Sequence, residues 1–263
     1  DKVIVPRHAH RSVFGALVLS GAEPVYVYPD WHSWGFALGV APRDYQQALI
    51  NHPEARAVLV VSPTYEGWAG NIESIVSVCH EEKRVVICDE AHGAHFYFHP
   101  DLPTGALRAG ADVVVHSPHK VLGALTQGGM LHLGQEMKDN RVGEALYNLQ
   151  TTSPSFVLLA SLDVARRQMA VCGSLLLSRA IEMARELGEF IGRSTKFSCL
   201  GNEAAGEAVG GRDPLKICLG LTGVGCSGKE LAELLRERYG VEVEMAGPGY
   251  VLLMITFADG PSR

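Results

Sequence analysis

The chain has 263 residues, of which 47% are hydrophobic and 20% are charged, and its formal net charge is −6. This composition is that of a globular protein and excludes disorder over most of the length. The longest apolar runs, such as Val58–Val61, are far shorter than the roughly 20 residues that span a bilayer. The acidic balance argues against binding to a nucleic-acid backbone.

The six cysteines form no C-x-x-C pair. Most stand inside apolar runs, as Cys88 and Cys218 do, which is typical of buried thiols in a reducing compartment. No segment has the pattern of a secretion signal. We therefore expect a cytoplasmic protein or one from a plant-type plastid. Because the chain begins with Asp1 and its first residues already have a strand pattern, we also expect a fragment or a shortened chain.

Short β-branched runs alternate with helical patterns over the first half of the chain. Continuous apolar strands separated by helices are typical of a parallel sheet covered on both faces. The pattern therefore predicts the α/β doubly wound class, in which ligands bind at the carboxyl ends of strands. The expected strands are Val3–Val5, Pro24–Tyr28, Arg56–Ser62, Arg84–Asp89, Asp112–His116 and Gly129–Leu133, and the expected helices are His10–Ser20, Pro42–Asn51 and Ile72–Lys83.

After about residue 135 the pattern changes to that of a smaller α+β unit. We divide the chain into a large domain at 1–172 and a helical connection with a small domain at 173–263. Residues 200–213, rich in Gly and Glu, are expected to form a surface loop or linker. The expected helices are Asn140–Gln150, Ser155–Gly192 with a break near Cys172 and Gly173, and Ser227–Tyr239, and the expected strands are Leu215–Leu221, Val241–Met245 and Tyr250–Phe257.

Polar clusters follow three of the expected strands. They are Ser62–Gly67, Asp89–Gly93 and Ser117–Lys120. Because the carboxyl ends of parallel strands meet at one edge of a sheet, we expect the carboxylate of Asp89 and the amine of Lys120 to face the same site.

Each of these two residues has more than one interpretation. Burial of the Lys120 amine would favour its neutral form, which can form a Schiff base; the alternative is an ordinary surface lysine. Asp89 could ligate Mg²⁺, pair with an arginine, hold a protonated pyridine nitrogen or cap the next helix. The spacing of His92 and His95 resembles a metal site, but no third ligand follows at a matching distance, so zinc is not expected.

Taken in order, the motifs Asp-x-Ala-His-Gly and Ser-x-His-Lys resemble those of pyridoxal-phosphate enzymes of fold type I. More narrowly, they resemble the Orn/Lys/Arg decarboxylase family, major domain. The resemblance implies an aspartate-aminotransferase-like large domain, with a mostly parallel sheet flanked by helices, and a smaller α+β C-terminal domain. The supporting segments are Arg7–Ser12, Ser20–Tyr26, Ser62–Gly67, Asp89–Gly93, Ser117–Lys120 with Ala124–Gln127, and more weakly Asp213–Lys216 and Leu234–Met245.

The resemblance also implies an activity and partners. The protein would remove CO₂ from arginine, lysine or ornithine to give a polyamine-type amine, with pyridoxal 5′-phosphate as cofactor and no metal. It would form a homodimer or larger homo-oligomer with the site near the interface. Aminotransferase or aldolase chemistry uses the same lysine and aspartate, so both remain alternatives.

Roles for single residues follow from the same resemblance. Lys120 would attach the cofactor as a Schiff base, Asp89 would keep its pyridine nitrogen protonated, and His10 would stack on its ring. Lys120, His92 and His10 would be catalytic, with either His92 or Lys120 as the proton donor. The other expected contacts are Ala91 with the second ring face, His92 near the Schiff base, Ser117 and His119 with the phosphate, and Thr64 with the ring hydroxyl.

One departure from the family pattern concerns the phosphate. Family members carry a Ser/Thr/Gly-rich loop, opening a helix, upstream of the region where this chain starts. We therefore expect either a shortened chain or a copy that binds its cofactor weakly. A non-catalytic, decarboxylase-like subunit that associates with a complete partner is a further alternative.

An unrelated class matches two short motifs. Asp89–His92 spells the DEAH box of helicases, and Gly223–Lys229 fits the phosphate-loop pattern G-x-x-x-x-G-K. However, Glu230 replaces the hydroxyl residue that would hold Mg²⁺, and the two motifs stand in the reverse order. The alternative is a strand-to-helix turn with Ser227 as the N-cap.

Overall fold

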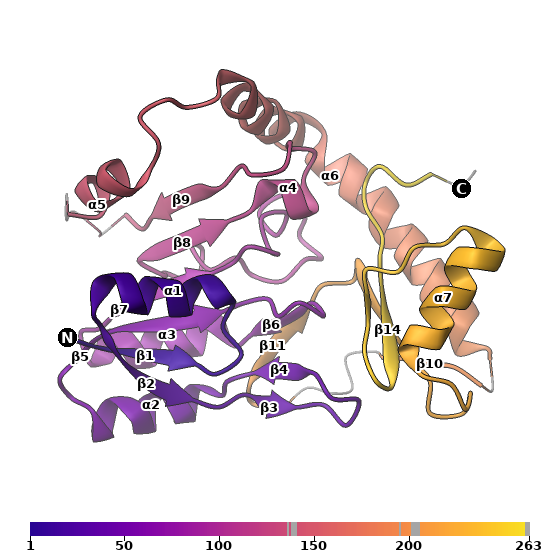
Figure 1. Cartoon of the computed structure of the whole chain (residues 1–263), viewed down its shortest axis with the longest axis horizontal. Helices are drawn as coiled ribbons and strands as arrows, with labels where there is room; N and C mark the ends of the chain where they lie inside the picture. Colours follow the sequence, from indigo (N-terminus) through magenta and orange to yellow (C-terminus); the bar gives the residue numbers. More distant parts are fainter. Residues whose placement is uncertain (136, 138–140, 195, 201–205, 261–263) are drawn as a thin grey trace.

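The computed structural model describes residues 1–135, 137, 141–194, 196–200 and 206–260. Its main feature is a six-stranded sheet with the order β2-β1-β5-β7-β8-β9 (Figure 1). All neighbouring strands run parallel except β9, which is antiparallel to β8, so the expected mostly parallel α/β sheet is confirmed. The strands are β1 (Lys2–Pro6), β2 (Glu23–Val27), β5 (Ala55–Val61), β7 (Val85–Asp89), β8 (Val113–His116) and β9 (Met130–Leu133).

Two helices bury one face of this sheet. In α3 (Ile72–Glu81), the side chains of Ile72, Ile75, Val76 and Cys79 follow the i, i+3, i+4, i+7 spacing of a buried helical stripe. Helix α2 (Pro42–Asn51) packs beside α3 and inserts its own apolar side chains into the same core. The strand residues that face these helices, such as Val58 and Val86, are fully buried, whereas most of their neighbours on the opposite face of β5 and β7 are only half-buried.

Helix α1 (Arg11–Ser20) lies on the other side of the sheet, in front of it in Figure 1. All ten of its residues are half-buried or exposed, and the side chains of Val18 and Leu19 are 83% and 81% exposed. The helix begins at the His10 cap and ends where Gly21 adopts a left-handed φ of 68°. The two faces of the sheet are therefore covered unequally within the described residues.

Helix α6 (Phe156–Gly192) runs without interruption for 37 residues, so the expected break near Cys172 and Gly173 is wrong. Gly173 has a packing role instead: a Cβ at this position would lie 3.1 Å from the Cβ of Phe98. The close packing of Phe98 on α6 thus accounts for the glycine at position 173. In an exposed helix, a glycine would lower the stability by up to about 1 kcal/mol relative to alanine. Before α6 stands α5 (Arg141–Leu149), and residue 140, where we expected this helix to begin, lies outside the described residues.

The C-terminal part contains a four-stranded antiparallel sheet with the order β10-β12-β14-β13 and one helix. The expected strand Val241–Met245 is wrong over most of its length. Gly240 ends α7 in a left-handed conformation, and the Val241 N–H donates back to the Leu235 carbonyl, so Val241 belongs to the helix exit. The elements are β10 (Ser198–Cys199), β12 (Lys216–Gly220), α7 (Gly228–Tyr239), β13 (Met245–Ala246) and β14 (Tyr250–Met254).

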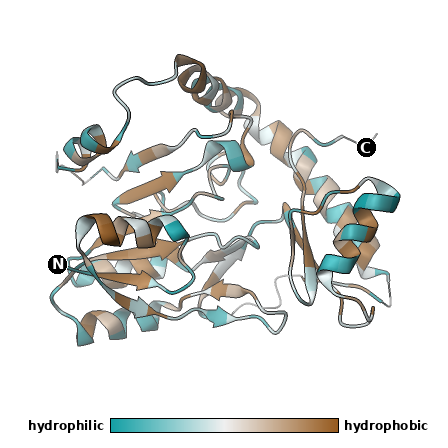
Figure 2. Ribbon diagram, viewed as in Figure 1, coloured by the Kyte–Doolittle hydropathy of each residue, from teal (hydrophilic) through white to brown (hydrophobic). Residues whose placement is uncertain are grey.

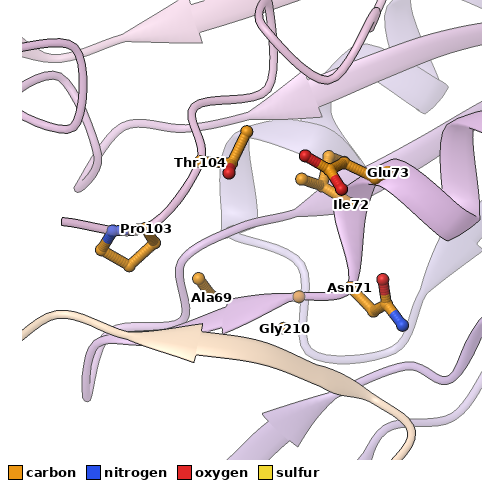
Figure 3. A pocket seen from close by; sticks show the side chains of 8 residues that line it. Ala69, Asn71, Ile72, Glu73, Pro103, Thr104 and Gly210 are labelled. Atoms are coloured by element: carbon orange, nitrogen blue, oxygen red, sulfur yellow. The ribbon is translucent and has the colours of Figure 1, made fainter. Parts of the chain in front are cut away.

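Part of the expected 200–213 loop is a strand. Strand β11 (Val209–Arg212) pairs with β6 (Trp68–Gly70), and residues 201–205 lie outside the described residues. A Cβ on Gly210 would lie 2.7 Å from the Gly70 carbonyl oxygen, so glycine allows the two backbones to meet. A small hollow of about 70 Å³ beside this pair is shown in Figure 3. The hairpin of β3 (Asp30–Trp31) with β4 (Ala37–Gly39) also has no counterpart among the expected elements.

Two further observations bear on the alternative classes. Ser227 caps α7 in a reciprocal box with Glu230, which confirms the capping interpretation of the Gly223–Lys229 motif. Within the described ranges, the structure contains no helix both long and apolar enough to cross a membrane.

Candidate active site

The candidate site is a cavity of about 410 Å³ at the carboxyl ends of β1, β5, β7 and β8. The strand order changes direction between β1 and β5, which is where open α/β sheets bind their ligands. Six of the residues singled out in the sequence line this cavity. They are His10, Asp89, Ala91, His92, Ser117 and Lys120.

Lys120 stands in α4 (Pro118–Val121), the short helix that follows β8. Its backbone N–H donates to the Ser117 carbonyl over 3.0 Å, which fixes the turn. Its half-buried side chain places Nζ 3.2 Å from Nε2 of His92. The expected meeting of these two strand ends is therefore present in the structure.

His92 is held in a buried and positively charged setting. Burial, with smaller contributions from the nearby Lys120 and Lys216, lowers its pKa to about 3. The ring of Tyr65 lies 4.7 Å from the His92 ring, centroid to centroid. His92 is therefore a neutral imidazole at neutral pH.

The Asp89–His92 motif splits between the cavity and the core. Asp89 ends β7, and its Oδ1 accepts the Ala91 N–H over 3.2 Å. Glu90 is 1% exposed and accepts hydrogen bonds from the Tyr97 hydroxyl and the Ala106 N–H, over 2.6 and 2.7 Å. Its other neighbour is His116, with Nε2 2.7 Å from Oε2. The carboxylates of Asp89 and Glu90 thus serve different environments and do not form a paired acidic site.

Two predicted site residues do not line the cavity. Nδ1 of His119 lies 2.8 Å from the Gly128 carbonyl oxygen. Thr64 is 2% exposed, and its hydroxyl accepts the Trp68 N–H over 3.2 Å. Both side chains are engaged in the local backbone around the site.

His10 has two structural roles. It lines the cavity, and its Nδ1 also accepts the Ser12 N–H over 3.3 Å as the N-cap of α1. The histidine is therefore both the start of a helix and part of the cavity wall.

Sequence reasoning missed His8 and Tyr65 as lining residues. Both ring nitrogens of His8 are buried without a hydrogen-bond partner among the described residues. Burial lowers the pKa of His8 to about 4. Burial also raises the pKa of Tyr65, to about 12, with its hydrogen bond to Glu244 adding to the effect. His8 and Tyr65 stand inside the motifs Arg7–Ser12 and Ser62–Gly67, and this position could have indicated that they belong to the site. No sequence pattern near Glu244 indicates its contact with Tyr65.

A second group of buried charges lies behind Tyr65, at the junction with the C-terminal sheet. Asp213 and His95 are each 1% exposed, and Oδ2 of Asp213 lies 3.0 Å from Nε2 of His95. Burial opposes the charge of Asp213, but His95 and the Leu215 N–H outweigh it and lower the pKa of this carboxyl. Glu66 accepts the Tyr250 hydroxyl over 2.8 Å. Lys216 completes the group.

Comparison with known families gives one match over most of the chain. The model of the family described as "Orn/Lys/Arg decarboxylase, major domain" matches residues 1–210. An arginine decarboxylase of Bacillus anthracis is 37% identical over 100% of this chain and 54% of its own length. Lysine decarboxylase LdcA of Pseudomonas aeruginosa is 28% identical over 64% of this chain and 26% of its own length. The chain thus spans about half the length of the first of these relatives.

Solved structures show the same fold. Lysine decarboxylase A from Pseudomonas aeruginosa superposes with a TM-score of 0.86 at 22% identity, covering 99% of this chain and 43% of that one. The ureidoglycine-glyoxylate aminotransferase of Bacillus subtilis superposes with a TM-score of 0.69 at 15% identity, covering 98% of this chain and 69% of that one.

Proposed function

Because the chain belongs to the Orn/Lys/Arg decarboxylase family and has the fold type I architecture, we propose that it removes the α-carboxylate of a basic amino acid with pyridoxal phosphate as cofactor. The observation that carries the proposal is the contact of Lys120 Nζ with His92 Nε2, at 3.2 Å, in a cavity that also holds Asp89. Arginine is the first substrate to test, because the 37% identical relative from Bacillus anthracis is an arginine decarboxylase.

The residues of the cavity fit the cofactor. A volume of about 410 Å³ is within the roughly 300–1,000 Å³ of small-molecule pockets. The His8 ring nitrogens and Nδ1 of His92 are buried without partners among the described residues. Since a buried polar atom left unpaired costs free energy, a polar ligand would stabilise this wall.

Four residues are assigned to the cofactor in this proposal. When bound, pyridoxal phosphate supplies the electron sink for the electron pair left on the substrate Cα as CO₂ departs. Asp89 would hold the pyridine nitrogen in its protonated form, and Lys120 Nζ would provide the covalent attachment. His10 would face the ring, and Ser117 would bind the phosphate. The engagement of His119 with Gly128 favours Ser117 for this last contact.

The geometry also favours one of the two candidate proton donors. His92 is neutral above about pH 4, because its pKa is lowered to about 3. Its Nε2 can therefore accept a hydrogen bond from Lys120 Nζ. Lys120 then carries the proton that returns to Cα, and His92 orients it.

The experiment is product analysis with arginine, lysine and ornithine on the full natural protein loaded with pyridoxal phosphate. The proposal predicts CO₂ and the matching amine from one of the three, and their loss in Lys120→Ala. Formation of a keto acid without CO₂ would support aminotransferase chemistry. Absence of any product with cofactor bound would support the non-catalytic alternative.

We further propose that the protein is a homodimer. Figure 2 shows hydrophobic residues along the first turns of α6, where Phe156, Val157 and Val164 are 80%, 67% and 65% exposed. Apolar side chains gathered on a surface mark an interface, and a second copy would cover them. Sedimentation of the wild type and of Phe156→Glu tests this, since the substitution should favour the monomer.

We also propose that the protein resides in a reducing compartment. All six cysteines are free thiols, and three of them are buried. Reduced cysteines fit a reducing compartment such as the cytoplasm.

A further inference from the structure

A buried lysine of the C-terminal sheet stands next to the active-site wall. Lys216 begins β12, is 1% exposed, and its Nζ has no hydrogen-bond partner among the described residues. Burial lowers the pKa of Lys216, and the carboxylates that face it, Glu244, Asp213 and Glu66, offset this only in part by favouring its protonated form. Burying a positive charge without a paired partner costs free energy. We therefore ask which role of Lys216 accounts for a lysine at this buried position.

The stem of Lys216 packs on the loop that follows β5. Gly67 has a φ of 92°, and a Cβ there would lie 2.7 Å from the Cβ of Lys216. The Gly67 carbonyl accepts the Asp213 N–H over 2.8 Å, which closes the contact from the other side. The loop that carries Tyr65 is thereby fixed to the C-terminal sheet.

The amine of Lys216 is connected to the candidate site through contacts with Tyr65 and His92. Its Nζ lies 5.3 Å from the centre of the Tyr65 ring, in a cation–π arrangement. The Tyr65 hydroxyl donates to Glu244 over 2.8 Å, and the Tyr65 ring lies 4.7 Å from the His92 ring. His92 in turn contacts Lys120. A continuous series of contacts therefore runs from β12 to the lysine that would bind the cofactor.

We propose that Lys216 is a positioning residue: from the C-terminal sheet it holds Tyr65 against His92, and through His92 it sets the orientation of Lys120. The inference rests on the proposed function for its catalytic consequence. Its effect on His92 can be measured without cofactor or substrate.

The sign of the electrostatic effect follows from the groups around His92. Lys120, Lys216 and His95 lower its pKa, Asp213 raises it, burial lowers it most, and the uncharged Tyr65 ring covers it. Replacing Lys216 by methionine removes one of the lowering charges and leaves Asp213 in place. The pKa of His92 should therefore rise.

The first experiment is an NMR pH titration of the full natural protein without cofactor, with the His92 signal assigned through His92→Gln. In the wild type this signal should not titrate between pH 5 and 8. In Lys216→Met its midpoint should move upward, whereas Lys216→Arg, which keeps the charge and the ring contact, should restore the wild-type behaviour. Lys229→Met is the matched control, since the Lys229 side chain is 84% exposed.

The second experiment separates positioning from a general structural role. Lys216→Met should lower kcat by roughly 10- to 100-fold, with KM changed little, because a small misplacement of a catalytic group has effects of this size. Tyr65→Leu should give a similar loss. The double variant should lose no more than either single variant, because Lys216 acts through Tyr65, and Lys216→Arg should regain most of the rate.

An unchanged His92 titration together with an unchanged kcat in Lys216→Met would overturn the inference. If Lys216→Met does not fold, Tyr65→Leu with wild-type kcat or an inactive but folded Lys216→Arg would overturn it. If the wild type shows no decarboxylation, the proposed function fails, and the His92 titration still decides the positioning claim.

Discussion

The active-site cavity has two walls of different origin. One is the strand-end wall, where Asp89 ends one strand of the parallel sheet and Lys120 follows another. The other is the junction wall, where Tyr65 lines the cavity and is contacted by Lys216 and Glu244 of the C-terminal part, which do not line it themselves. The first depends on sheet topology and the second on packing between distant segments. The groups proposed to react and the groups proposed to orient them therefore depend on different features of the sequence.

The largest expected effect is at the strand-end wall. Lys120→Ala removes the amine that would bind the cofactor and carry the proton, so kcat should fall by about 10²–10⁴-fold or more. Steady-state release of CO₂ measures this. Lys229→Ala, at a side chain that is 84% exposed, is the control and should keep wild-type kcat. An equal decrease of kcat in both variants would show that Lys120 has no specific role in the reaction.

Asp89→Asn keeps the size of the side chain and removes its charge. We expect kcat to fall by about 10²–10³-fold, as for other losses of a preorganised electrostatic group, and cofactor retention to weaken. Dialysis followed by absorbance spectroscopy measures retention. Asp101→Asn is the control, because the Asp101 side chain is 72% exposed. Normal turnover in Asp89→Asn would show that this residue only caps the Ala91 N–H.

A third prediction concerns stability in acid. Burial lowers the pKa of His92 to about 3 and that of His8 to about 4. The unfolded chain therefore binds more protons below the ordinary histidine pKa of about 6.5, and the free energy of unfolding should decrease as the pH falls from there to about 4. Each histidine contributes up to about 1.4 kcal/mol per pH unit.

Urea unfolding at several pH values checks this slope. His8→Gln should flatten it, because the substitution removes one of the two rings whose pKa burial lowers. An unchanged slope in His8→Gln would mean that His8 is not buried as a neutral ring, and the strand-end wall would need a different arrangement.

The smallest effect lies outside both walls. Ser227→Ala removes the N-cap of α7, so the free energy of unfolding should decrease by about 1 kcal/mol. The rate of decarboxylation should be unchanged, because Ser227 is the N-cap of α7 and belongs to neither wall of the cavity. Thermal unfolding and the CO₂ assay measure the two quantities. A loss of activity with unchanged stability would reopen the phosphate-loop interpretation of Gly223–Lys229.

The strand-end wall could be predicted because its signals are local. Apolar runs gave the strands, parallel topology brought their ends together, and Asp89, His92 and Lys120 stood directly after them. The same rule could not indicate that Thr64 and His119 lie outside the cavity lining, since the direction of a side chain within a turn is set by local hydrogen bonds.

The junction wall could not be predicted, because no local pattern indicates that β12 meets the Tyr65 loop. Lys216 looked like an ordinary strand residue, and Glu244 fell in a segment wrongly expected to be part of a strand. Two glycines also led to wrong structural predictions. Gly173 and Gly210 suggested a helix break and a loop, but each permits a close approach that only the folded chain reveals.

We propose that Lys120, and not Lys216, bears the cofactor. Borohydride reduction of the full natural protein loaded with pyridoxal phosphate, followed by proteolysis and mass spectrometry, tests it directly. We expect a stable phosphopyridoxyl group on the peptide that contains Ser117–Lys120. The same group on Lys216, with Lys120 unmodified, would contradict the assignment of the site.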